Sequence, residues 1–258
     1  MATFPIYEIY VELEGYEPKM WRKFTVMNNI TMSRLAYILM TLFELRNRYS
    51  YEFRKDEMEM FLQKHNEYAN HPERLQDLNK EFKKLRYGIT SKKNTYMFKK
   101  AEGFEPMQDA TKVQLKDVLK SARDYIYFFY DPETNWKIKI ILDKVVIDKS
   151  CYPKDLPNII DGSGYGIIEK CGGIKQLQNF REELKKKQWR IGKIDYKYYS
   201  AKGETSRLLF DKFDVDDMNY RIKILPKAYQ EQYENNYYLA KRQINVMKRR
   251  YKIYRKKR

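Results

Sequence analysis

The chain has 258 residues, 43% of them hydrophobic and 16% aromatic, which is enough for one large domain or two small ones with a buried core. Its 52 Lys and Arg against 35 Asp and Glu give a net charge of +17, which favours a polyanionic partner and excludes an acidic mimic of DNA. The sequence has neither a run of 18 apolar residues nor a signal peptide, and its two cysteines suit a reducing compartment. We therefore expect a cytoplasmic protein with no membrane segment.

The first 53 residues predict two strands, a helix and a third strand. Strand-forming residues fill 6–14 and 21–26. Between 31 and 45, apolar residues recur three or four positions apart, which predicts a core-packing helix capped by Thr31 or Ser33. A short aromatic strand is expected at 49–53.

The middle of the chain continues this mixture. Helical spacing over residues 56–88, broken at His71-Pro72, predicts an inserted charged helical hairpin. The elements expected after it are a strand at 94–98, a short helix at 113–119, strands at 123–130 and 136–147, a long Gly- and Pro-containing loop at 153–173, a helix at 174–187 and a basic, aromatic strand at 189–199.

The last 33 residues carry eleven Lys and Arg but only two acids, Glu231 and Glu234. Pro226 suits the first turn of a helix. Seven apolar residues then follow at spacings of four and three, a stripe that predicts a packed helix face and is also compatible with a dimer: Tyr233, Tyr237, Ala240, Ile244, Met247, Tyr251 and Tyr254. We divide the chain into a domain at 1–225 and a basic helical extension at 226–258.

Four motifs between residues 5 and 222 resemble, in order and spacing, those of the Ri-plasmid open-reading-frame-three-like proteins, which occur on plasmids and as passengers of insertion elements. The motifs are Trp21-Arg22, then Phe128-Phe129-Tyr130-Asp131 with Trp136, then Tyr152-Pro153 through Asp161-Gly162 to Cys171-Gly172-Gly173, and finally Phe210 to Val215. The resemblance implies an α+β fold with a mainly antiparallel sheet and packed helices. It also places Trp21 and Trp136 in the core.

The chain departs from this family at several polar positions. Tyr49 and Tyr51 stand where the family usually has His, and Ile138 replaces a His after the Trp. Of the family's acidic groups only Asp131 and Glu169 remain. If family members use those groups for metal or acid–base chemistry, this chain has lost most of them.

Motifs for catalysis are weak. Cys151 and Cys171 are twenty positions apart and distant in sequence from both His residues, which suits neither a zinc site nor a Cys–His nucleophile. The stretch 162–166 is glycine-rich but lacks the Gly-Lys-Ser/Thr ending of a phosphate loop. Asp131, Glu133 and Asp161 are candidate ligands for a divalent cation. We expect no metal, no cofactor and no catalysis.

Nucleic acid is the favoured partner. Basic residues interleaved with Tyr neutralise phosphates while the rings stack on bases or pack below. The expected contacts are Lys241, Arg242, Lys248, Arg249, Arg250, Lys252, Arg255, Lys256, Lys257 and Arg258. One alternative is a phage- or plasmid-encoded inhibitor of a host defence nuclease, anti-CRISPR-like, that binds a protein or ribonucleoprotein. Another is a divalent-metal-dependent enzyme that uses Asp131 and Glu169.

Overall fold

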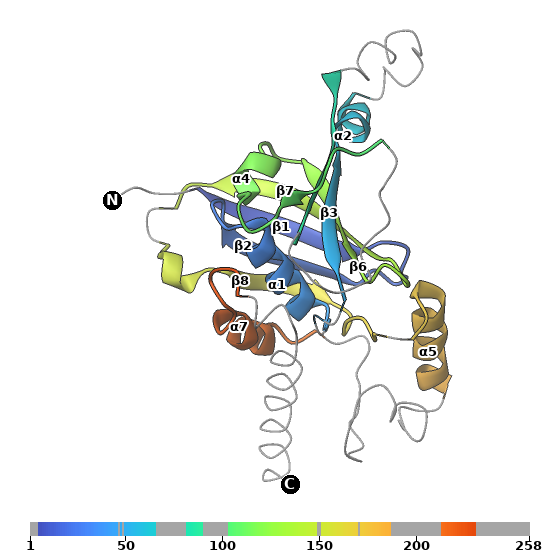
Figure 1. The fold of residues 1–258 in the computed structure, drawn as a ribbon. Helices are drawn as coiled ribbons and strands as arrows, with labels where there is room; N and C mark the ends of the chain where they lie inside the picture. The colour runs from blue at the N-terminus through green and yellow to red at the C-terminus, as the bar shows by residue number, and fades with distance from the viewer. Residues whose placement is uncertain are drawn as a thin grey trace.

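The structure is a computed structural model and describes residues 5–45, 47, 49–65, 81–89, 103–148, 151–169, 171–186 and 213–230. Within these residues the strands form one sheet in the order β5-β4-β3-β6-β7-β1-β2-β8 (Figure 1). The strands are β1 (Ile6–Leu13), β2 (Trp21–Met27), β3 (Tyr51–Asp56), β4 (Lys84–Gly88), β5 (Gln108–Asp109), β6 (Tyr125–Tyr130), β7 (Trp136–Val146) and β8 (Asn158–Ser163). Neighbouring strands are antiparallel except β4 and β5, which are parallel. The expected α+β fold with a mainly antiparallel sheet is therefore confirmed.

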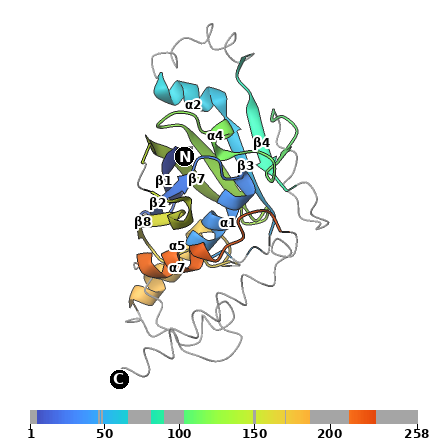
Figure 2. The same cartoon turned by 90° about the vertical axis from the view of Figure 1, so that its left-hand side faces the viewer.

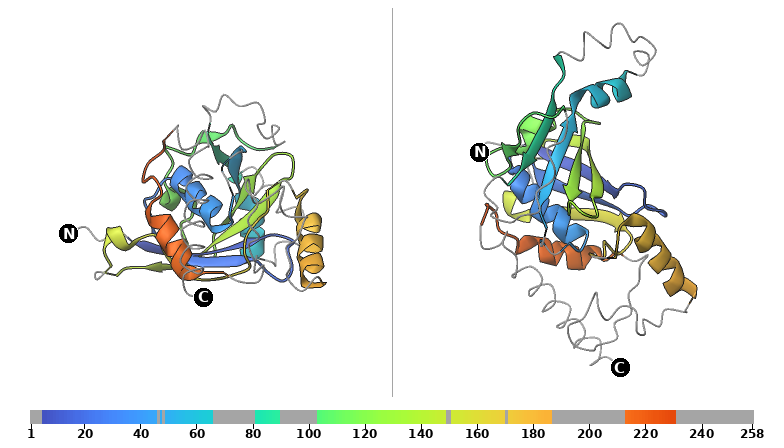
Figure 3. Two further views of the ribbon diagram at one scale, coloured as in Figure 1. Left: turned by 90° about the horizontal axis from the view of Figure 1, so that it is seen from below. Right: turned by 45° about the vertical axis from the view of Figure 1, so that its right-hand side comes forward.

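The helices of the described residues are α1 (Met32–Leu42), α2 (Glu57–Lys64), α4 (Leu115–Val118), α5 (Ile174–Lys186) and α7 (Val215–Lys223), with a 3-10 turn at Pro153–Asp155. Helices α1 and α7 lie side by side near the β8 end of the sheet, and α5 lies at the periphery (Figures 1 and 2). Helix α2 lies at the far end of β3, away from α7 (Figure 3). No helix in the part of the chain that the structure describes is long and apolar enough to cross a bilayer.

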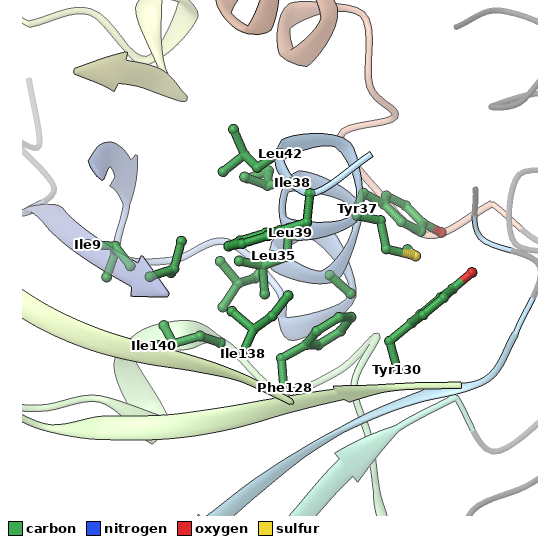
Figure 4. Close-up of a cluster of buried hydrophobic side chains, with 14 of the residues drawn as sticks. Ile9, Leu35, Tyr37, Ile38, Leu39, Leu42, Phe128, Tyr130, Ile138 and Ile140 are labelled. Carbon is green, nitrogen blue, oxygen red and sulfur yellow. The ribbon is translucent and has the colours of Figure 1, made fainter. Parts of the chain in front are cut away.

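Helix α1 is the centre of the core. Its eleven residues are all buried, because one side packs on the sheet and α7 lies against another. Leu35, Ile38 and Leu39 are in the same cluster as the inward-facing side chains of β1, β6 and β7 (Figure 4). The N-cap is Thr31, as expected, and its hydroxyl accepts a hydrogen bond from the Arg34 N–H at 3.2 Å.

Three expectations about elements are wrong. Residues 84–88, placed in the helical hairpin, form β4, which pairs with β3 along its whole length. The loop expected at 153–173 contains β8, which pairs with β2 at the edge of the sheet. Residues 226–230 are irregular, so no helix begins at Pro226. The strands expected at 94–98 and 189–199, and residues 231–258, lie outside the described residues.

Trp136 is fully buried, as expected, whereas Trp21 is not in the core. Side chains alternate across a strand, and Arg22 and Phe24 take the inward positions of β2. Trp21 therefore lies on the opposite face of the sheet, half-buried and stacked on Tyr10 with ring centroids 5.6 Å apart.

Candidate functional site

All ten residues expected to bind nucleic acid lie in 231–258, outside the described residues. The structure does place the start of the segment that carries them. The Arg34 guanidinium donates a hydrogen bond to the Pro226 carbonyl, and the Gln230 N–H donates one to the Tyr37 hydroxyl at 3.5 Å. Tyr229 packs against the core. Residues 226–230 are thus held on α1, and the basic segment begins at a fixed point of the domain.

Helix α7, which leads into residues 226–230, is attached to the domain through a buried ion pair. Arg221 donates two hydrogen bonds to the Glu44 carboxylate, and its Nε lies 3.3 Å from the Asp217 carboxylate. Burial lowers the pKa of Arg221, but the charges of Glu44 and Asp217 outweigh it, so the pKa is raised. Because the guanidinium is charged and nearly inaccessible, this pair fixes α7 to the end of α1 rather than binding a ligand.

Arg22 is the most deeply buried charged group of the domain's described part, and four carbonyl oxygens surround it. Its Nε donates to Leu42 O at 3.0 Å, Nη1 to Trp21 O at 2.7 Å and Ser163 O at 2.5 Å, and Nη2 to Tyr165 O at 3.0 Å. These carbonyls belong to β2, the end of α1, β8 and the loop after β8. The guanidinium fork therefore joins four segments, which gives the Trp-Arg motif a structural role.

Two rings complete the Arg22 site. The guanidinium carbon lies 4.0 Å from the centre of the Phe213 ring and 5.0 Å from that of Phe43. Burial lowers the pKa of Arg22 to about 9, with the Glu44 charge opposing the shift. The group is fully enclosed and still charged at neutral pH, so it stabilises the fold and offers nothing to an external anion.

The glycine-rich stretch 162–166 closes over Arg22 and Glu44. A Cβ on Gly162 would lie 2.6 Å from the Phe213 ring, and one on Gly166 would lie 2.7 Å from the Glu44 side chain. A phosphate loop directs backbone N–H groups at an anion. Here Ser163 and Tyr165 direct carbonyl oxygens at a cation, so the stretch has the opposite polarity and serves packing.

The two retained family acids are both engaged within the fold. Asp131 is buried with φ +60°, and its carboxylate accepts hydrogen bonds from the Glu133 N–H at 3.1 Å and the Thr134 hydroxyl at 2.6 Å. Glu169 accepts one from the Tyr130 hydroxyl at 2.7 Å. Asp131 thus shapes the β6–β7 turn. Among the described residues no three His, Cys, Asp or Glu side chains are close enough together to hold a metal ion.

Neither cysteine has the electrostatic environment of an activated thiol. Burial raises the pKa of both the Cys151 and the Cys171 thiol, whereas activated cysteines have a lowered pKa. His65 is the C-cap residue of α2, and its ring packs against the Phe61 ring with the centroids 4.7 Å apart. His71 falls outside the described residues.

The sheet face opposite α1, which we call the outer face, is charged and aromatic. Lys23 pairs with Glu8 at 2.6 Å and with Asp143 at 2.8 Å. The same face has the pairs Lys19–Glu12 and Lys137–Glu14, and the Lys137 ammonium lies 3.8 Å from the centre of the Tyr127 ring. Since positive and negative groups alternate here, the outer face does not concentrate positive charge.

Comparisons with known proteins agree with the fold. The family model described as "Plasmid pRiA4b ORF-3-like protein" matches residues 5–221. The crystal structure of a protein of unknown function, MM3350 from Methanosarcina mazei Go1, aligns with a TM-score of 0.56 at 18% identity, over 84% of this chain and 97% of that one. No curated protein gives a significant match. At that identity the structural likeness concerns the fold alone.

Proposed function

We propose that this chain, which belongs to the plasmid pRiA4b ORF-3-like protein family, is a non-catalytic binding protein of a mobile element that engages nucleic acid through its basic C-terminal segment. The observation that carries the proposal is the distribution of charge. Residues 226–258 contain 11 Lys and Arg against two acids, whereas the preceding 225 residues contain 41 against 33. Over half of the net charge of +17 thus belongs to an eighth of the chain.

The described domain supports this division of roles. Many of its cations are already neutralised, either in ion pairs on the outer face or in the enclosed sites of Arg22 and Arg221. No acidic residue follows Glu234 in the sequence, whereas ten Lys and Arg do. Cations of this density displace the counterions of a nucleic acid, which is the main source of sequence-independent affinity.

The test is a salt titration of binding to double-stranded DNA, single-stranded DNA and RNA. The full-length protein is compared with a full-length variant in which Lys248, Arg249, Arg250 and Lys252 are changed to Gln. The matched control has the same net charge as this segment variant, because four exposed lysines of the domain are changed to Gln instead: Lys19, Lys112, Lys116 and Lys154. A shortened chain should end after Gln230, because ending at Leu225 would remove Tyr229 and the Pro226 carbonyl from their contacts with the domain.

We expect tight binding to at least one nucleic acid, with log K falling linearly with log salt concentration. On double-stranded DNA the slope should decrease by about 0.9 for each phosphate that the segment variant no longer neutralises. The control should retain the slope of the original protein. If the two variants bind alike, or if the original protein binds no nucleic acid, the proposal fails and a protein or ribonucleoprotein target takes its place.

A further inference from the structure

Strand β7 is longer than its neighbour β6, so the C-terminal residues of β7 extend past β6 and leave an open strand edge. The pairing of β6 with β7 ends at Tyr125 and Ile141, followed by hydrogen bonds that join Arg123 and Asp124 to Leu142. From Asp143 to Val146, β7 continues with β1 as its single partner among the described strands. The backbone edge of these residues that faces away from β1 has no strand beside it in that part of the structure.

Asp143 and Lys144 in this overhang are charged, but its last two residues and Ile147, which directly follows β7, are apolar and exposed. Val145 is 45% exposed, Val146 37% and Ile147 69%. Three adjacent β-branched residues on an open edge are the usual template for the addition of another strand. Natural proteins commonly protect such edges with charge or proline, and neither interrupts these three positions.

We propose that this overhang pairs with the same overhang of a second copy of the chain, in an antiparallel two-fold arrangement centred on Val146. In that register Val145 lies opposite the partner's Ile147, and Lys144 lies opposite the partner's Asp148. Each apolar residue then meets an apolar one and each charge meets the opposite charge. A two-fold interface requires such self-complementarity.

The two faces of the strand are consistent with this register. Lys144 lies 3.6 Å from Glu8, on the outer face, whereas Val145 is opposite Tyr7, whose hydroxyl donates to Leu119 O on the other face. Since side chains alternate along a strand, the two Val–Ile pairs would gather on the α4 side and the two Lys–Asp pairs on the outer side. Apolar and charged pairs would thus lie on opposite faces of the joined strands. Because this match depends on both strands having the same sequence, it favours a second copy of the chain over a peptide of unrelated sequence.

The experiment is sedimentation velocity of the full-length, nucleic-acid-free protein over a concentration series. We expect a reversible monomer–dimer equilibrium, and Ile147→Lys should raise the dimer Kd by about tenfold or more, since it puts a charge into an apolar cross-strand pair. The matched control is Ile160→Lys, another exposed apolar residue, on β8. It should leave the equilibrium unchanged.

A charge exchange tests the register itself. Lys144→Asp and Asp148→Lys each place like charges opposite each other, so each should weaken the dimer. The double variant K144D/D148K should restore it, which a variant that merely damages the fold would not do. A protein that stays monomeric at every concentration, a dimer that Ile147→Lys leaves intact, or a double variant without recovery would each overturn the proposal.

Discussion

The side-chain amide of Asn219 in α7 satisfies the backbone of Ile159 in β8. The Ile159 N–H donates to Asn219 Oδ1 at 2.7 Å, and Asn219 Nδ2 donates to Ile159 O at 3.0 Å. One side chain thus occupies both hydrogen-bonding groups on which a further strand would build. At this end of the sheet the edge is covered by a helix, which is a common protection against strand addition.

Replacing Asn219 with Ala should therefore destabilise the domain by about 1–2 kcal/mol, because both backbone groups of Ile159 lose their partners. Urea denaturation measures the free energy of unfolding. Tyr220→Ala is the matched control, since it removes a side chain that is 56% exposed from the same helix. Equal losses in the two variants would mean that the Asn219 hydrogen bonds contribute nothing.

Replacing Arg22 with Lys should cost about 3 kcal/mol or more, although the charge is kept. An ammonium group cannot reach the carbonyls of Leu42, Ser163 and Tyr165 together, so buried acceptors lose their donors. Arg123→Lys, at an exposed position, should change the unfolding free energy by less than about 0.5 kcal/mol. A mild effect at position 22 would show that the fork geometry is dispensable.

Glu44 and Arg221 should be strongly coupled. Removing either partner alone, as in Glu44→Gln or Arg221→Met, takes from the other buried charge the group that forms two hydrogen bonds with it, and Arg221 would keep only the Asp217 carboxylate near its Nε; each change should cost about 3–5 kcal/mol. The double variant should lose much less than the sum, because it leaves neither charge behind. A double-mutant cycle of unfolding free energies gives the coupling directly, and additive losses would contradict a buried pair.

Asp124 should make the stability of the domain depend on acid pH. Burial raises the pKa of its carboxyl, but hydrogen bonds from Lys64 Nζ and from the N–H groups of Lys120 and Ser121 outweigh it, so the folded pKa lies below the ordinary value of 3.8. A lowered folded pKa contributes stability that is fully present above the unfolded pKa and is lost as pH falls through the folded one.

The expected result is that the unfolding free energy of the original protein declines more steeply below about pH 4 than that of Asp124→Asn. At pH 7 the variant should be the less stable of the two. Denaturant titrations at several pH values provide the measurement. Parallel curves for the two proteins would exclude Asp124 as a source of the acid dependence.

The elements that the sequence predicts well are those whose pattern agrees with their packing. β6 is a run of aromatic and β-branched strand formers, β7 alternates apolar and charged residues over its first half, and α1 keeps its apolar spacing because it is the centre of the core. β8 is predicted as part of a loop, because Asp161, Gly162 and Ser163 are residues typical of turns. Arg22, Phe213 and Asn219, all distant in sequence, contact this strand and fix it at the edge.

β4 resembles a helix in the sequence because Phe82 and Leu85 keep a helical spacing, and pairing with β3 overrides that local preference. The enclosed site around Arg22 and Glu44 could not be found from one sequence either, since its members span positions 22 to 221. The ten basic residues of the C-terminal segment remain a prediction from charge and spacing, because none of them lies in the described part of the chain.

The Glu44–Arg221 contact spans 177 positions, and this has a consequence for synthesis. During translation the residues of β1, β2 and α1 emerge early, whereas the partner of Glu44 is among the last residues of the domain. Until residue 221 leaves the ribosome, the nascent chain has an unpaired carboxylate at the end of α1 and an uncovered edge at β8. A domain that closes with such distant contacts folds slowly, and a chain interrupted before α7 should depend on chaperones.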